Sequence, residues 1–308
     1  MAPPPTPEGD AADPLAEAFF GRLMDGPMRL ASGTGPDAPE RIGDWEVHEP
    51  IGRGGVSLVY NAVRQTPYGP ERAAVKLGKR PGAEVVALFE REATMLRRLP
   101  PMLVVRLLDQ GLYTDGRPYL AMETAVGQRS TDHARRLSPW ERLLLAWRLC
   151  RAVAVLHDEG VVHADLKPEH LLVRPDGAVT ILDFGLARDL LDASDTPSGL
   201  RLGITPEFAA PEQVLGEPVT RATDVFALGL VIHEIMLGRR KRVPWALGKV
   251  ALDLPATPDD AVGSPWASVD WSLVGVLQTA VQADPDRRYA SADALAEALD
   301  GVLDATAS

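Results

Sequence analysis

A change in the spacing of apolar residues near residue 127 constrains the fold of this chain more than any other feature. From Trp45 onward, short runs such as SLVYNAVR and RAAVKL alternate apolar and polar residues, and turn residues such as TPYGPE separate them. Such runs predict antiparallel strands. Beyond residue 127 most runs have helical spacing. Strands followed by helices indicate an α+β chain with two lobes and a cleft between them.

Two segments depart from this division. The segment 84–99, EVVALFEREATMLRRL, has helical spacing among the strands, and further strands are expected in 102–113 and 118–124. Within the helical part, LLVRPDGAVTILDFG (171–185) contains two short apolar runs on either side of Asp176-Gly177. Such a dipeptide between apolar runs predicts a β-hairpin.

The two ends of the chain are expected to lie outside the folded domain. Residues 1–43 are rich in Pro, Ala, Gly and acidic residues, a composition that buries too little apolar surface to offset ordering entropy. We expect a flexible extension, within which 13–26 has the spacing of a short helix. Residues 305–308 are expected to form a short tail.

Charge and cysteine content narrow the possible partners. The chain has 43 acidic and 32 basic residues and a net charge of −11, which disfavours binding to nucleic acid or to an anionic membrane surface. Its one cysteine, Cys150, excludes an intrachain disulfide and is typical of a reducing compartment. The apolar runs are too short or too charged to span a membrane, and the N-terminus lacks the pattern of a signal peptide. We therefore expect a cytoplasmic location.

The glycine-rich turn IGRGGVSLVY (51–60) is the first candidate for ligand binding. Gly52 and Gly54 have no side chains to prevent backbone N–H groups from approaching a phosphate, and Ser57 occupies the third position of the G-x-G-x-x-G pattern. The turn leads into a strand rather than a helix, which disfavours a dinucleotide-binding fold. A plain hairpin turn would show the same pattern.

The second candidate is Lys76, the only charged residue of the apolar run AAVK. An unpaired ammonium group there would be costly to bury, so a carboxylate partner is expected, and we assign Glu92 in FEREA. The alternative is a lysine that emerges from a strand end into water.

A set of motifs in a fixed order carries more information than either candidate alone. After the glycine-rich turn, AAVK and Glu92 come HADLKPEH (163–170), DFG (183–185), APE (210–212), TDVFALG (223–229) and ADPDRRY (283–289). This set resembles the eukaryotic-like serine/threonine protein kinase family of bacterial type, over residues of about 44 to 304. The resemblance implies an N-lobe over 44–123 with a small antiparallel sheet and one helix, a hinge at 123–127 and a mainly helical C-lobe over 128–304.

The resemblance also implies ATP, a divalent metal ion and a role for each matching residue in phosphoryl transfer. Asp165 would accept the proton of the substrate hydroxyl, Lys167 would neutralise the γ-phosphate, and Asp183 would hold Mg²⁺. Lys76, oriented by Glu92, would hold the α- and β-phosphates. The other residues expected around ATP are Gly52, Gly54 and Ser57 near the phosphates and Val59, Ala74, Met122, Glu123, Ala125 and Leu172 around adenine.

Two positions of the loop HADLKPEH depart from the family. Ala164 replaces an arginine that, in many members, pairs with a phosphate on the activation loop. A phosphate on Ser194, Thr196 or Ser198 would therefore lack a bidentate partner, and we expect activity to be independent of that contact.

His170 replaces an asparagine that binds Mg²⁺ through its amide oxygen. Mg²⁺ prefers oxygen ligands, whereas imidazole suits Mn²⁺, Zn²⁺ and other transition metals. Three outcomes are open: a second metal ion bound weakly or through water, a preference for Mn²⁺, or nucleotide binding without productive transfer.

The resulting hypothesis is an ATP-dependent serine/threonine protein kinase that acts on protein hydroxyls, with possible autophosphorylation at Ser194, Thr196, Ser198 or Thr205. The alternative is a pseudokinase that serves as a nucleotide-binding or scaffolding module because of His170. A small-molecule kinase shares the catalytic and metal-binding aspartates. A small-molecule kinase is disfavoured for two reasons. The chain carries an APE segment and Arg288, which in the family pairs with the glutamate of that segment, and its loop around Thr205 resembles the family's peptide-docking region.

Overall fold

The computed structural model describes residues 39–191 and 205–237, and within the remainder 245–246, 249–250, 252, 254–255, 257, 262, 265–268 and 270–307. These residues belong to one structural unit that begins at Pro39. The expected helix at 13–26 and the residues Ser194, Thr196 and Ser198 lie outside the described residues.

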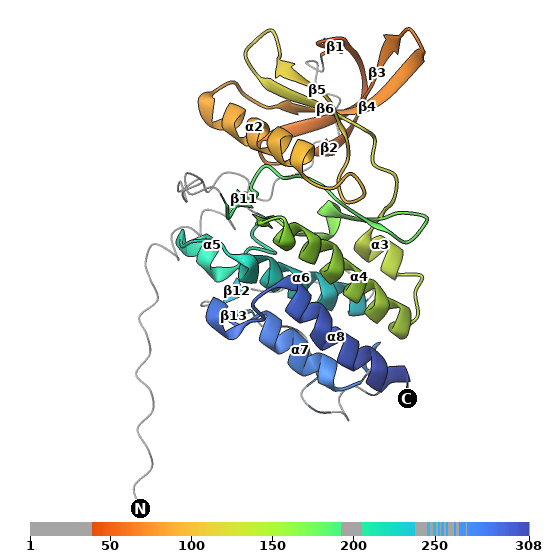
Figure 1. The fold of residues 1–308 in the computed structure, drawn as a ribbon, viewed down its shortest axis with the longest axis vertical. Helices are drawn as coiled ribbons and strands as arrows, with labels where there is room; N and C mark the ends of the chain where they lie inside the picture. The colour runs from red at the N-terminus through yellow and green to blue at the C-terminus, as the bar shows by residue number, and fades with distance from the viewer. Residues whose placement is uncertain are drawn as a thin grey trace, which may run out of the picture. The chain divides into compact units, whose positions relative to one another are not determined.

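The N-lobe contains a six-stranded sheet in the order β1-β2-β3-β4-β6-β5, with every neighbouring pair antiparallel (Figure 1). One helix, α2 (Ala83–Arg98), packs on β5 and β6, and its apolar side chains face the sheet. The strands are β1 (Arg41–Ile42), β2 (Trp45–Arg53), β3 (Ser57–Thr66), β4 (Gly69–Gly78), β5 (Leu107–Leu112) and β6 (Pro118–Met122).

Alternation along β4 decides which side chains face α2. Ala73, Val75 and Leu77 belong to a small apolar cluster on one face of the sheet, which also contains Trp45. Because successive side chains of a strand point to opposite faces, Lys76 lies on the other face. The spacing of apolar residues in β4 thus directs this ammonium group toward the helix.

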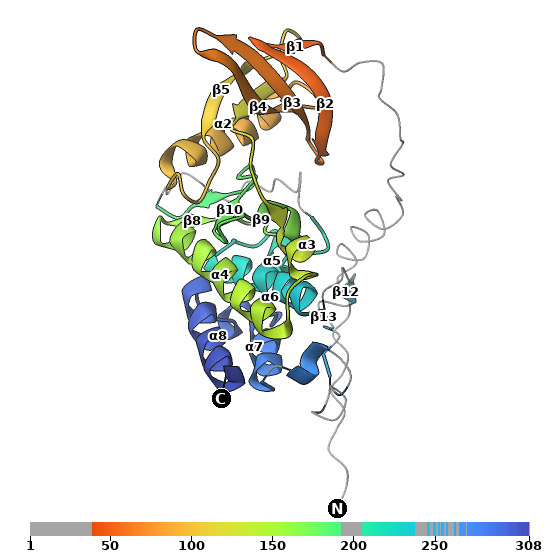
Figure 2. The ribbon, with the colours of Figure 1, turned by 90° about the vertical axis from the view of Figure 1, so that its right-hand side faces the viewer.

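The C-lobe is mainly helical, and α8 packs along α4 in both ribbon views (Figures 1 and 2). The helix α4 begins with a capping box between Ser138 and Glu141 and a proline at its first turn, features that stabilise a helix N-terminus. The central helix α6 is buried nearly all round. The helices are α3 (Ser130–Ala134), α4 (Pro139–Asp158), α5 (Pro211–Leu215), α6 (Arg221–Leu237), α7 (Ser272–Ala280) and α8 (Ala292–Ala307).

Short strands and 3₁₀ turns complete the C-lobe. The predicted hairpin around Asp176-Gly177 is present as β9 and β10, and Gly177 adopts the left-handed φ of 80° that its turn requires. The short elements are β7 (Gln128–Arg129), β8 (Val161–Val162), β9 (Leu171–Val173), β10 (Val179–Ile181), β11 (Arg188–Asp189), β12 (Trp245–Ala246), β13 (Lys249–Val250), η1 (Pro168–His170), η3 (Pro265–Ser268) and η4 (Pro285–Arg287).

The strand predicted over 102–113 is wrong in its first half, because β5 begins only at Leu107. Three of the preceding apolar residues, Leu103, Val104 and Val105, are buried in irregular backbone. The Leu103 N–H donates to the Pro100 carbonyl in a turn, and the Leu103 carbonyl accepts from the Ile181 N–H at 2.8 Å. A buried apolar run of this length has no periodicity that separates a strand from such a turn.

The folded part of the chain also extends past both predicted boundaries. Ile42 pairs in β1 and is fully buried beside Trp45, two residues before the expected start at 44. At the other end, α8 continues to Ala307 instead of giving way to a tail after 304.

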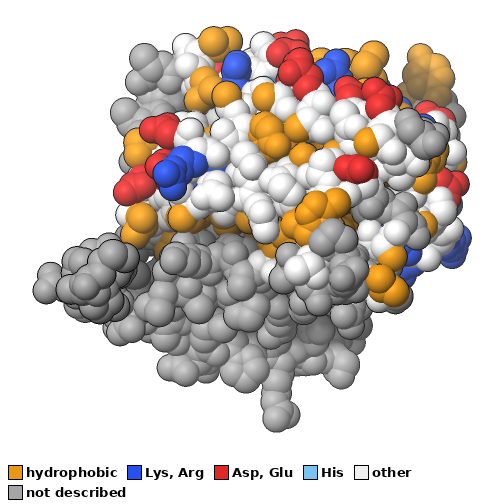
Figure 3. Space-filling view, turned by 90° about the horizontal axis from the view of Figure 1, so that it is seen from below, with side chains coloured by type: hydrophobic (Ala, Val, Ile, Leu, Met, Phe, Trp, Pro, Cys, Tyr) orange, Lys and Arg blue, Asp and Glu red, His pale blue; other side chains and the backbone are white. Residues whose placement is uncertain are grey.

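Seen from below, the described part of the molecular surface carries acidic and basic side chains interspersed with small groups of hydrophobic ones (Figure 3). Basic side chains form no extended patch on the described part of this face. Across the described ranges, no helix has both the length and the apolar character needed to cross a bilayer.

Candidate active site

A cavity of about 410 Å³ lies between the N-lobe sheet and the hairpin β9–β10. Every residue predicted for nucleotide or metal binding lines it, and Lys167 does so as well, whereas Asp165 does not. Sequence reasoning assigned no role to eight further lining residues, of which Ile51, Arg53 and Glu169 lie within the quoted motifs: Ile51, Arg53, Leu96, Val105, Thr124, Arg129, Glu169 and Leu182.

Lys76 forms ion pairs with two carboxylates at the inner end of this cavity. Its Nζ lies 2.6 Å from Glu92 Oε2 and 2.7 Å from Asp183 Oδ1. Burial alone would lower the pKa of Lys76, but the charges of Asp183 and Glu92 outweigh it and raise the pKa. The ammonium group is therefore charged and held between α2 and the DFG segment.

The two carboxylates respond to burial differently. Burial raises the pKa of Glu92 to about 7, with Lys76 opposing the rise. For Asp183, burial also favours the neutral acid, but the charge of Lys76 outweighs burial and brings the pKa of Asp183 well below its ordinary value. Asp183 is therefore ionised at neutral pH.

The glycine-rich turn is closed by contacts within its own hairpin. The Gly54 N–H donates to the Ser57 carbonyl at 3.0 Å, and Ser57 is buried. Lys79 Nζ donates to the carbonyl of Gly55 at 3.0 Å and also contacts the carbonyl of Gly54. Lys79 has no motif that marks it in the sequence, and this contact emerges only from the paired strands β3 and β4.

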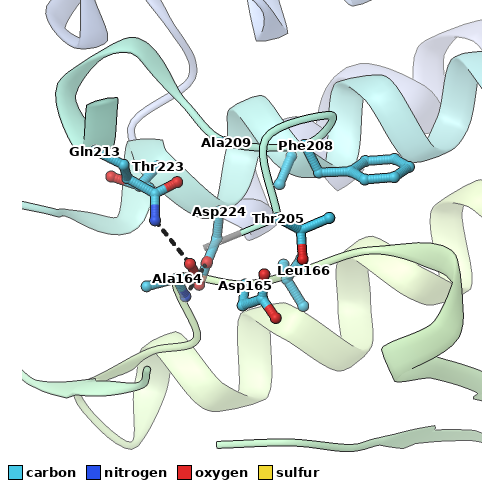
Figure 4. Close-up of a pocket in the computed structure, with 10 residues that line it drawn as sticks. Ala164, Asp165, Leu166, Thr205, Phe208, Ala209, Gln213, Thr223 and Asp224 are labelled. Carbon is cyan, nitrogen blue, oxygen red and sulfur yellow. Dashed lines mark hydrogen bonds between the residues drawn. The ribbon is translucent and has the colours of Figure 1, made fainter. Parts of the chain in front are cut away.

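The side chain of Asp165 lies beside the segment that carries Thr205 (Figure 4). Lys167 Nζ donates to Asp165 Oδ2 at 2.8 Å and to Thr205 Oγ1 at 2.7 Å. The Lys167 ammonium group therefore links Asp165, the predicted base, to the loop around Thr205.

Buried hydrogen bonds from α6 hold the backbone of the loop 163–170. Asp224 on α6 is fully buried and accepts the N–H groups of His163 and Ala164 at 2.8 and 2.9 Å. His157 Nδ1 accepts from the Ala292 N–H, so its Nε2 carries the proton and donates to Asp224 at 3.1 Å. The sequence places Asp224 in the motif TDVFALG but does not identify its partners.

His163 connects the catalytic loop to the strand before DFG. Its Nε2 lies 2.9 Å from the Leu182 carbonyl, which can only accept, so Nε2 carries the proton. Its Nδ1 then accepts the Asp165 N–H at 3.2 Å. The backbone of Asp165 is therefore tied to the DFG segment through one imidazole ring.

His170 has a defined tautomer as well. Its Nδ1 lies 2.8 Å from the Asp165 carbonyl oxygen and must donate to it. Burial lowers the pKa of His170 to about 4, against the opposing charges of Asp183 and Asp165, so the ring is neutral at neutral pH. Its Nε2 then presents a lone pair 3.5 Å from Asp183 Oδ2.

The donor atoms of Asp183 and His170 suit a divalent cation that is shared with a nucleotide. Asp183 supplies an ionised carboxylate at the wall of the cavity, and His170 supplies a neutral nitrogen beside it. Across the described residues, no three His, Cys, Asp or Glu side chains gather to hold a metal ion by themselves. Phosphate oxygens and water would therefore complete the coordination, as is common for Mg²⁺.

The two-lobed fold, the glycine-rich turn over the cavity and the Asp165–Lys167 loop together define a protein kinase domain. The chain belongs to the protein kinase domain family, which it matches over residues 45–298. The predicted α+β two-lobed fold and the resemblance to bacterial serine/threonine kinases are confirmed. Family membership implies the use of ATP and a divalent cation.

Named relatives are bacterial serine/threonine-protein kinases. The chain is 34% identical over 285 residues to serine/threonine-protein kinase Pkn1 of Myxococcus xanthus, which covers 85% of this chain and 39% of the relative. It is 29% identical over 268 residues to probable serine/threonine-protein kinase PknB of Corynebacterium glutamicum, covering 82% and 41% of the two chains. The chain thus spans about two fifths of the length of these relatives.

Proposed function

We propose that this chain transfers the γ-phosphate of ATP to serine or threonine hydroxyls of proteins. The observation that carries the proposal is the position of Lys76, whose Nζ lies within 2.7 Å of both Glu92 and Asp183 at the inner end of a nucleotide-sized cavity. Phosphoryl transfer depends mainly on positioning and on neutralising phosphate charge, and this arrangement holds a cation ready for both.

Each residue of the site has a task in this reaction. Asp165 accepts the proton of the attacking hydroxyl, and Lys167 beside it neutralises the transferred phosphoryl group. A divalent cation held by Asp183 would neutralise charge between the phosphates. The short contact from Lys167 to Thr205 favours a protein substrate over a small molecule, because it orders the segment on which a peptide would dock.

Adenine would lie between Val59 and Ala74 on one side and Leu172 on the other, with Met122 behind it. The Glu123 N–H already donates to the Arg106 carbonyl at 2.8 Å. The adenine contact that we assign to Glu123 therefore uses its carbonyl oxygen, and the contact assigned to Ala125 uses its backbone as well.

The test is transfer of labelled γ-phosphate to the protein itself and to a basic protein substrate, with Mg²⁺, with Mn²⁺ and without metal. Transfer that requires a metal ion and yields phosphoserine or phosphothreonine supports the proposal. If no metal supports transfer while ATP still raises the melting temperature, the chain is a nucleotide-binding module. Autophosphorylation at Ser194, Thr196, Ser198 or Thr205 is read from the same reaction by mass spectrometry.

Replacing His170 with asparagine is expected to shift metal preference toward Mg²⁺. The neutral Nε2 beside Asp183 suits Mn²⁺, whereas an amide oxygen suits Mg²⁺. We expect the ratio of Mg²⁺-supported to Mn²⁺-supported transfer to rise by about tenfold, the usual size of an altered ligand sphere. The ATP-dependent rise in melting temperature, measured with each metal, should change in the same direction.

The matched control is His48→Asn, a change at an exposed histidine on β2 outside the cavity. It should leave the ratio of Mg²⁺-supported to Mn²⁺-supported transfer, and the ATP-dependent rise in melting temperature, as they are in the wild-type protein. An unchanged metal ratio in His170→Asn would show that the imidazole does not contact the metal ion, and His170 would then serve only to hold the Asp165 carbonyl.

A further inference from the structure

The side chain of Gln213 joins two segments of the site that are far apart in the sequence. Gln213 lies in α5, directly after the APE motif, and is 9% exposed. Its Nε2 donates to the Ala164 carbonyl at 2.7 Å (Figure 4). Its Oε1 accepts from the Ala210 N–H at 3.0 Å. Both ends of one amide are therefore used, one toward the catalytic loop and one toward the segment that begins at Thr205.

The residue that Gln213 contacts has a strained backbone. Ala164 has a φ of 61°, in the left-handed region that is unfavourable for residues other than glycine. Such a conformation persists only where surrounding contacts hold it. Asp224 binds the N–H groups on one side of Ala164, and Gln213 binds the carbonyl on the other.

The Ala164 carbonyl belongs to the peptide group that carries Asp165. The N–H of the same peptide group donates to His163 Nδ1 at 3.2 Å. The peptide plane is thus held at its carbonyl by Gln213 and at its N–H by His163. A rotation of this plane would turn the Asp165 carboxylate away from Lys167.

The Gln213 amide lies in a closely packed part of the protein. The space lined by Ala164, Asp165, Thr205 and Gln213 has no room for a water molecule while the glutamine is in place. Loss of the amide would leave the Ala164 carbonyl and the Ala210 N–H buried without these partners, which is unfavourable in such a space.

We propose that Gln213 is a positioning residue that orients the Asp165 peptide and couples it to the segment 205–210 without a phosphate. The inference rests on the proposed kinase function. Because residue 164 is alanine, no guanidinium at this position links the loop to a phosphate. The Gln213 amide provides a permanent link between the same two parts of the site.

The test compares Gln213→Met and Gln213→Glu with Gln278→Glu, a change at an exposed glutamine on α7. We expect Gln213→Met to lower kcat by at least about tenfold, since small displacements of catalytic groups have effects of this size or larger. The KM for ATP should change by less than about twofold, because Gln213 does not line the ATP cavity. Gln278→Glu should match the wild-type protein.

Gln213→Glu adds a second measurement, the pH dependence of activity, which would not change if Gln213 had a purely structural role. The carboxylates of Asp165 and Asp224 line the same space, so burial and like charge both raise the pKa of an introduced carboxyl group. When ionised it repels the Ala164 carbonyl, and when protonated its O–H donates to it. Activity relative to wild type at each pH should therefore recover as the pH falls.

Wild-type kcat in both variants overturns the proposal, as does a loss of kcat that parallels lower ATP affinity and shows no recovery at low pH. A wild-type protein without transfer in any metal contradicts the kinase function instead. Amide hydrogen exchange then decides the positioning role: Gln213→Met should exchange faster than wild type over residues 163–167, and unchanged exchange there overturns it.

Discussion

Replacing Asp165 with asparagine is expected to reduce phosphate transfer by about 10²- to 10⁴-fold, the usual contribution of a general base. An amide cannot accept the proton of the substrate hydroxyl, but it has nearly the shape of the carboxylate and can still accept from Lys167. Because Asp165 does not line the ATP cavity, nucleotide binding should be retained. Rates come from labelled γ-phosphate transfer, and ATP affinity from the nucleotide-dependent rise in melting temperature.

Asp300→Asn, at an exposed position on α8, provides the matched control and should retain wild-type transfer. If Asp165→Asn lost ATP binding together with activity, Asp165 would be a residue that shapes the nucleotide site and not the base. Activity near the wild-type level would move the role of base to another group.

Some contacts could be predicted from the sequence because the periodicity of a single strand or helix determines which way the side chain points. Alternation in β4 turns Lys76 toward α2, and the helical spacing of α2 places Glu92 on its buried face, so this pair was predictable from two short runs. The same reasoning found the hairpin β9–β10, since Asp176-Gly177 is a strong turn signal.

Sequence patterns could not predict the contacts that form only in the assembled fold. The Gln213 amide meets Ala164 across 49 positions of the chain, and nothing in the run PEQVL distinguishes it from a solvent-facing helical glutamine. The pairs β7–β9 and β8–β11 involve strands of two or three residues, too short to show a period. Ile42 was missed for a similar reason, because one buried residue does not alter the composition of a polar segment.

The same distinction separates the two departures in the catalytic loop. The sequence shows that His170 is an imidazole, but its tautomer depends on the Asp165 carbonyl that it meets in the fold. Likewise, Ala164 removes a guanidinium in the sequence, and only the structure shows that Gln213 contacts the backbone at that position. The sequence therefore reveals which chemical group each departure adds or removes, but not the contacts that the new residue or its backbone makes in the fold.

Replacing Arg288 with methionine is expected to destabilise the domain by about 3–5 kcal/mol, because it leaves a buried charge without its partner. The side chain of Arg288 is 0% exposed and that of Glu212 is 2% exposed, with two parallel contacts of 2.8 Å between them. The remaining donor capacity of the guanidinium serves three backbone carbonyls, those of Gln282, Ala222 and Ala283. Methionine has a similar length but supplies no N–H group.

For a domain of this size, such a loss lowers the melting temperature by roughly 10 °C, and thermal and urea unfolding both measure it. Arg287→Met, at the exposed neighbouring position, is the matched control and should unfold like the wild-type protein. Adding Glu212→Gln to Arg288→Met should recover part of the loss, since it removes the unpaired carboxylate. Arg288→Met with wild-type stability would show that Glu212 finds another partner, and the link from the APE segment to the end of η4 would then not hold the C-lobe together.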